Sequence, residues 1–195
     1  ALFAIATTYA AYQAVRGRPD PTTWNALAWV MLLFTAFNGV SRTLEEDRPE
    51  VLAYLKTVVN PVHYLMARTL HNSAVLAGLA CLLTALMGLL MGWGTLEGPR
   101  LWGFLAGMAL TALALGATLT LIALIAARAG AGFGMTAVLG LPLVLPVVLV
   151  STSLGSDLMQ GVLVADTWHN FAFLGALAAG SGTLGVVLFP YLWRA

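Results

Sequence analysis

The feature of this sequence that most constrains its fold is a series of long runs without a charged residue. Five runs reach or exceed the roughly 20 residues that an α-helix needs to cross about 30 Å of hydrocarbon; they are Pro21 to Ser41, Asn72 to Leu96, Leu101 to Ala127, Ala129 to Ser156 and Thr167 to Trp193. Hydrophobic residues are 60% of the chain and charged residues 9%, against roughly 45 to 50% and 25% in an average soluble domain. The pattern predicts an all-α, polytopic membrane protein.

A shorter apolar run, from Ala1 to Val15, is interpreted as part of a first span that begins before the numbered sequence. It lacks the basic start and the cleavage pattern of a signal peptide, which is the rival interpretation. We therefore expect a single transmembrane domain over 1–195 with six membrane-spanning helices, the first of them truncated. Their approximate limits are 1–15, 22–41, 70–93, 101–127, 133–154 and 168–192.

Charge is concentrated between the second and third spans. The stretch from Arg42 to Arg68 holds four of the eight acidic and four of the nine basic residues of the chain. A Lys, Arg or Asp at the middle of a membrane helix costs about 2.5 to 3.5 kcal/mol on insertion scales. We therefore expect this stretch to lie in water.

The charged stretch also carries signals of a short helix. Asp47 and Glu50 flank Pro49 in an arrangement typical of a capped helix N-terminus. Apolar residues then recur at helical spacing up to Asn60-Pro61, which breaks the pattern. The sequence thus predicts a short amphipathic helix between the second and third spans.

The basic residues indicate which side of the membrane this helix occupies. If the spans alternate, Arg16, Arg18 and Arg100 fall on one side; the other side receives Arg42, Arg48, Lys56, Arg68, Arg128 and Arg194. Cytoplasmic loops carry an excess of Lys and Arg. The charged stretch and both termini are therefore expected in the cytoplasm.

Docking of a partner protein is the function we expect of the charged stretch. Its acidic and basic residues are equal in number, so attraction to anionic lipid headgroups, the rival role, is weak, while mixed charges give register to a protein partner. Lys56 is the only lysine and no phosphate-binding loop surrounds it. Any energy from ATP must then come from a separate chain.

Other polar positions give weaker predictions. Pro142 and Pro146 fall inside the fifth span and predict a kink in that helix. The kink either has a function in moving a substrate or serves only the packing of the helix. Asp166, Trp168 and His169 lie at the outer end of the sixth span, where they are interfacial anchors or a contact for a ligand on the outer side. Cys81 is expected to be a buried packing residue. No catalytic or metal-binding constellation is visible.

Four short sequence features resemble the haem exporter protein B (CcmB) family over the chain from the second span onward. They are Phe37 to Arg42 at the end of span two, Pro61 breaking the charged stretch, Leu141 to Pro146 in span five, and Phe189 to Arg194 at the terminus. The family's cytoplasmic N-terminal helix and half of its first span have no counterpart here.

The resemblance implies a permease subunit of the ABC-type complex of cytochrome c maturation in the bacterial inner membrane. Such a permease pairs with a cytoplasmic ATPase subunit, which holds the ATP, and with a haem-handling membrane subunit, a small single-span subunit and a periplasmic haem chaperone. A second copy of the permease is a further expected partner, and a nucleic acid is not. Haem is the expected substrate of the complex, and this chain itself is expected to bind no cofactor.

Carried over by position, the ATPase-coupling interface falls between the second and third spans. Its predicted residues are Glu45, Glu46, Asp47, Arg48, Glu50, Leu52, Tyr54, Leu55, Lys56 and Asn60. Two other hypotheses stay open: a structural or assembly subunit of a membrane respiratory complex, and an intramembrane enzyme, which the lack of polar catalytic groups disfavours.

Overall fold

The computed structural model describes residues 2–15, 19–45, 57–93, 96–128 and 133–194. All regular secondary structure in these ranges is helical. The helices are α1 (Leu2–Val15), α2 (Pro21–Glu45), α4 (Pro61–Met91), α5 (Pro99–Arg128), α6 (Phe133–Met159), the short 3₁₀ helix η1 (Val164–Thr167) and α7 (Trp168–Arg194).

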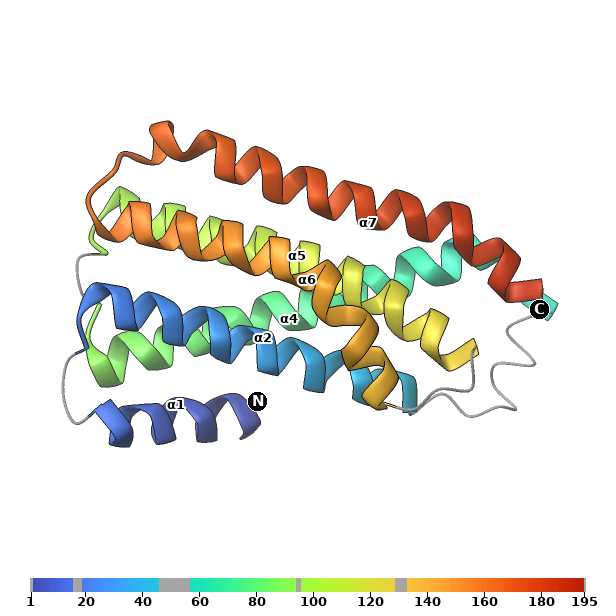
Figure 1. The fold of residues 1–195 in the computed structure, drawn as a ribbon, viewed down its shortest axis with the longest axis horizontal. Helices are drawn as coiled ribbons and strands as arrows, with labels where there is room; N and C mark the ends of the chain where they lie inside the picture. The colour runs from blue at the N-terminus through green and yellow to red at the C-terminus, as the bar shows by residue number, and fades with distance from the viewer. Residues whose placement is uncertain (1, 16–18, 46–56, 94–95, 129–132, 195) are drawn as a thin grey trace.

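The α-helices lie side by side along one long axis and alternate in direction (Figure 1). At one end of the bundle α2, α5 and α7 end while α4 and α6 begin; we call it the α2–α4 end. At the opposite end α4 and α6 end while α2, α5 and α7 begin; we call it the α4–α5 end. Loops therefore gather at the two ends, as expected where every span must satisfy its backbone hydrogen bonds internally.

Within the described residues, four helical segments are long and apolar enough to cross a membrane: Pro61–Met91, Pro99–Ala126, Val138–Met159 and Val164–Tyr191. The described chain thus has the architecture of an α-helical, polytopic membrane protein, as its uncharged runs predict. These four segments do not establish that the chain has six spans. α1 has 14 residues, fewer than the roughly 20 that a span needs, and α2 carries Asn25, Thr35 and Asn38 along its length. Six spans therefore stay a prediction.

Local hydrogen bonds to capping side chains define the starts of two helices, α2 and α4. Before α2, Asp20 accepts hydrogen bonds from the Thr23 hydroxyl (2.5 Å) and the Thr23 backbone N–H (3.2 Å). These bonds favour the charged carboxylate and lower the pKa of Asp20. Before α4, the side chain of Asn60 accepts a hydrogen bond from the backbone N–H of Val62 (3.0 Å), with proline at the first helical position. Both are N-caps of the common type.

Helix α5 is the centre of the bundle. It packs against α2, α4, α6 and α7, and 78% of its most apolar stretch is buried, against 11% for α7. Alanines and threonines at the centre of α5 let its neighbours approach closely, as is common where lipid supplies no hydrophobic drive to association. α7, by contrast, lies at the periphery.

An aromatic cluster joins α2 to α5 near the α4–α5 end. Trp24 and Trp29 both contact Phe104, with ring centroids 5.6 and 5.7 Å away, and all three side chains are buried. Trp29 donates a hydrogen bond to the side-chain oxygen of Asn25 (2.7 Å), and the Asn25 amide donates to the carbonyl of Thr152 in α6 (2.8 Å). A polar pair therefore ties α2 to α6 inside an apolar core.

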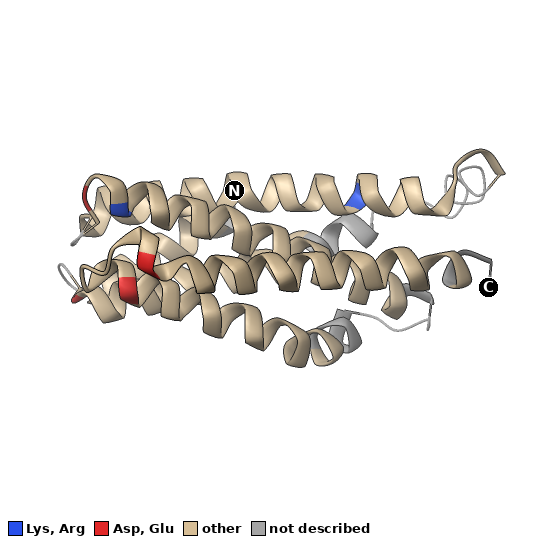
Figure 2. Ribbon diagram, turned by 90° about the horizontal axis from the view of Figure 1, so that it is seen from above, with Lys and Arg blue, Asp and Glu red and all other residues tan. Residues whose placement is uncertain are grey.

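The described charges separate by bundle end (Figure 2). Asp20, Glu97, Asp157 and Asp166 lie at the α4–α5 end together with Arg100, whereas Arg68 lies nearer the α2–α4 end. One prediction was wrong: Cys81 is exposed on α4 rather than buried. Membrane helices are apolar on every face, so an apolar neighbourhood in the sequence does not indicate which face packs.

Candidate functional site

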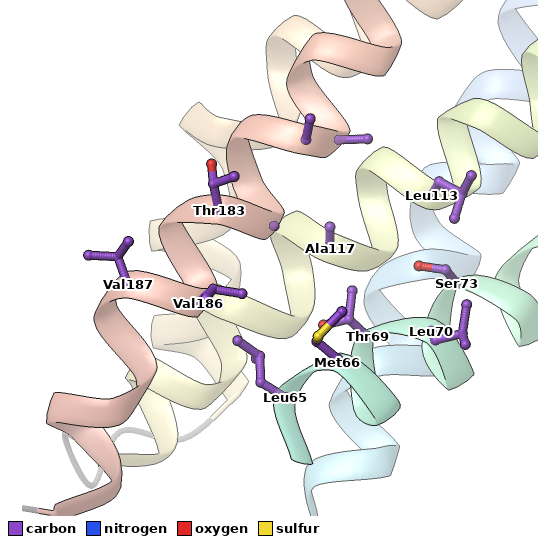
Figure 3. Close-up of a pocket in the computed structure, with 13 residues that line it drawn as sticks. Leu65, Met66, Thr69, Leu70, Ser73, Leu113, Ala117, Thr183, Val186 and Val187 are labelled. Carbon is purple, nitrogen blue, oxygen red and sulfur yellow. The ribbon is translucent and has the colours of Figure 1, made fainter. Parts of the chain in front are cut away.

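An apolar groove lies between α4, α5 and α7 in the half of the bundle nearer the α2–α4 end (Figure 3). Its volume is 540 Å³, within the roughly 300 to 1,000 Å³ of small-molecule sites. Leu65, Met66 and Leu70 form the α4 wall, Leu113 and Ala117 lie on α5, and Val186 and Val187 belong to the α7 wall.

The groove exists because α4 and α7 both touch α5 while small residues keep the space between them open. Ala178, Ala179 and Gly182 on the α7 wall project little or no side chain into it. Towards the α2–α4 end α4 and α7 meet, since a Cβ added at Gly185 would lie 3.1 Å from Leu65. There Tyr64 and Phe189 also stack, with centroids 6.0 Å apart.

The groove has few polar groups, and one of them is unusual. Thr183 donates its hydroxyl to the Gly180 carbonyl of its own helix (2.9 Å). The Ser73 side chain is 1% exposed, yet its Oγ has no hydrogen-bond partner within the described part of the chain. It points from α4 towards α5 and contacts Gly116, where any side chain would collide with it (Figure 3). An unsatisfied buried hydroxyl costs roughly 1 to 3 kcal/mol.

Hydrogen bonds between polar side chains tie α5 to α4, α6 and α7 near the groove. Thr118 pairs with Ser181 of α7 (2.7 Å), Thr120 accepts from the Asn72 amide of α4 (2.9 Å), and Thr111 pairs with Ser151 of α6 (2.7 Å). Such bonds are worth about 0.6 kcal/mol on average in a membrane protein. They fix the register of the helices around α5.

Most of the predicted coupling interface lies outside the described residues. Glu46, Asp47, Arg48, Glu50, Leu52, Tyr54, Leu55 and Lys56 belong to this part. Of the remainder, Glu45 is the last residue of α2 and Asn60 is the N-cap of α4. Thr57 and Val58 are helical, and Val59-Asn60 separates them from α4. Residues 46–60, which we call the charged segment, therefore connect the end of α2 to the start of α4, and both helix ends lie at the same end of the bundle (Figure 1).

The residues predicted at the outer mouth lie at the opposite, α4–α5 end. Asp166 is in η1, while Trp168 and His169 begin α7; all three are exposed, and the two rings meet edge to face at 6.5 Å. Among the described residues no group of three His, Cys, Asp or Glu could hold a metal ion. The neighbouring Asn170 donates to the carboxylate of Asp157 (3.1 Å), which fixes α7 to α6.

Pro142 and Pro146 both lie inside α6, which stays helical through them. Figure 1 shows α6 changing direction part-way along its length. A proline removes one backbone hydrogen bond and pushes away the carbonyl four residues earlier, so it is a common cause of such a bend. At Gly140, near these prolines, α6 approaches the ring of Phe37 in α2, which a Cβ would meet at 3.1 Å.

The groove itself was not anticipated from the sequence. Its threonines and Ser73 lie in apolar runs that contain no charged pair and no known motif. The spacing of Thr111 and Thr118, two helical turns apart on α5, was the available signal, since polar residues within a span commonly face another helix. No family model, curated protein or solved structure matches the chain.

Proposed function

We propose that this chain is a six-span permease subunit of an ABC-type transporter complex, driven through the charged segment between α2 and α4 by an ATPase on a separate chain. The observation that carries the proposal is the position of that segment. It joins the end of α2 to the start of α4 at one end of the bundle, and α4 directly forms one wall of the groove.

The packing supports a mechanical role for α4. It is one uninterrupted helix of 31 residues that begins at the Asn60 cap, so a force on the charged segment reaches the groove without an intervening loop. The contacts of α4 with α5 at Ser73–Gly116 and Asn72–Thr120 are close. α7 is held more lightly, since little of it is buried. A shift of α4 would therefore change the width of the groove chiefly against α7.

The motifs that resemble the CcmB family specify the proposal further. They suggest haem delivery for cytochrome c maturation, with release of a haem-loaded periplasmic chaperone. The further partners would be a haem-handling membrane subunit, a small single-span subunit and a second copy of the permease. In this proposal the α2–α4 end faces the bacterial cytoplasm. Arg42, Arg68, Arg128 and Arg194 fall at or near that end and Arg100 falls at the other, which agrees with an excess of basic residues inside.

Co-purification tests the proposal. The double variant Glu46→Lys/Glu50→Lys reverses charge in the predicted interface and is expected to insert normally but to lose the ATPase, measured by mass spectrometry of the complex in mild detergent. The matched control is Glu97→Lys/Asp166→Lys, which reverses two exposed carboxylates at the opposite end and should keep the ATPase. A wild-type complex with no ATPase would contradict the proposal and favour a structural or assembly subunit.

A further inference from the structure

A second cavity, at the α4–α5 end, belongs neither to the groove nor to the charged segment. Its volume is 500 Å³. The last turn of α4 forms one wall, and Trp24, Trp93 and Glu97 contribute side chains. Within the described lining, Glu97 is the sole charged residue.

The wall formed by α4 is electronegative because of how the helix ends. Gly92 follows Met91 with φ 83°, a conformation that suits glycine and turns the chain out of the helix. The last four carbonyls of a helix lack partners within it. From outside α4, no backbone hydrogen bond to the carbonyls of residues 88–91 is recorded within the described chain. Together they carry the partial negative charge of the helix C-terminus, equivalent to roughly half an elementary charge.

Two tryptophans are held in place at this wall. Trp24 is buried and donates its indole N–H to the Gly92 carbonyl (3.1 Å). The indole of Trp93 lies over Gly88, where an added Cβ would come 2.5 Å from the ring atom Cε2. A side chain at position 88 would meet the ring where it lies. The close approach at Gly88 therefore places Trp93 beside the C-terminal carbonyls of α4 and the exposed carboxylate of Glu97.

This combination of groups matches the chemistry of an organic cation. Tryptophan is the best aromatic partner for a cation, and cages of aromatic rings recognise ammonium groups. Carbonyl oxygens and a carboxylate add negative potential, which repels anions and attracts cations. A divalent metal would prefer several carboxylate, imidazole or thiolate ligands, and the described lining offers one carboxylate.

We propose that this cavity binds a small organic cation carrying a primary or quaternary ammonium group. The group is either the headgroup of a lipid or a soluble amine, since both present the same cation at this end of the bundle. Trp24 and Trp93 contact the cation, and Glu97 neutralises its charge. The carbonyls of the last turn of α4 attract either cation by their negative potential, and they accept hydrogen bonds only from a primary ammonium.

Calorimetric titration of tetramethylammonium chloride into the full chain, held in phosphatidylglycerol nanodiscs, tests the proposal against sodium chloride of equal ionic strength. Saturable binding specific to tetramethylammonium is expected. Glu97→Gln and Trp93→Ala should each raise its Kd about 3- to 10-fold, the size of a partly desolvated cation–π contact. Gly88→Ala should also weaken binding, because its Cβ displaces the Trp93 ring.

The matched controls are Asp166→Asn and Trp168→Ala, an exposed carboxylate and tryptophan at the same end but outside the cavity. They should leave the Kd unchanged. Nanodiscs that contain phosphatidylethanolamine distinguish the two sources of the cation. If the natural ligand is a lipid headgroup, the lipid competes and raises the apparent Kd of tetramethylammonium. If the natural ligand is a soluble amine, that Kd stays unchanged. Lack of saturable binding to the helical, wild-type chain, or equal losses in Glu97→Gln and Asp166→Asn, would overturn the proposal.

Discussion

Gly116, which has no side chain, sets the distance between α4 and α5. A Cβ at Gly116 would lie 2.9 Å from the Cα of Ser73 and would collide with its hydroxyl. The Cα belongs to backbone in the middle of a long helix, so it cannot rotate away as a flexible side chain could. The floor of the groove therefore depends on glycine at this position.

We expect Gly116→Ala to destabilise the folded bundle by about 1 to 3 kcal/mol, the usual cost of adding volume to a packed site. Gly182→Ala is the control, since an added Cβ there meets nothing within 4 Å and alanine favours the helix. Thermal unfolding in detergent, followed by circular dichroism, compares the two. Equal unfolding temperatures for both variants would contradict the close contact between α4 and α5.

Among the elements, α5 acts as a scaffold to which α4, α6 and α7 are each fixed by a separate polar pair. The pair that concerns the groove is Thr118–Ser181, because it holds the lightly buried α7 against α5. Loss of this bond leaves α7 attached mainly by apolar contacts. In a bilayer those contacts compete with equally apolar lipid.

A double-mutant cycle of Thr118→Val and Ser181→Ala should yield a coupling free energy of about 0.6 kcal/mol, with an upper bound of about 1.7. The readout is the free energy of unfolding in mixed micelles. Thr183→Val, which removes a hydroxyl bonded only within α7, should show no coupling to Thr118→Val. Coupling of the same size for both pairs would refute a specific tie between α5 and α7.

At the scale of the whole molecule, the direction of insertion decides which end meets which compartment. In a Cys81→Ser background, a cysteine at Asp166 should react with an impermeant maleimide on intact cells, because the α4–α5 end is proposed to face outward. A cysteine at Thr57, near the start of α4, should react only after lysis. The reverse labelling would place the charged segment outside and remove its access to a cytoplasmic ATPase.

The helical architecture could be predicted from the sequence because long uncharged runs leave few alternatives to membrane helices. The starts of α2 and α4 also carry local signals, in Asp20 and Asn60. The two cavities could not be predicted. Each depends on contacts between distant helices, such as Ser73 with Gly116, and helices that are apolar all round give no periodic signal of which face packs. The same lack of signal explains the error at Cys81.

The length of α4 links the two membrane surfaces. At 1.5 Å per residue its 31 residues span about 46 Å, more than the roughly 30 Å of a hydrocarbon core. Its first turns form a wall of the groove, and its last turn supplies the carbonyls of the opposite cavity. A stiff rod that slides along its axis moves both tips together. Binding at one tip would thus alter affinity at the other by an equal factor in each direction, so the two faces would communicate without any relay of side chains.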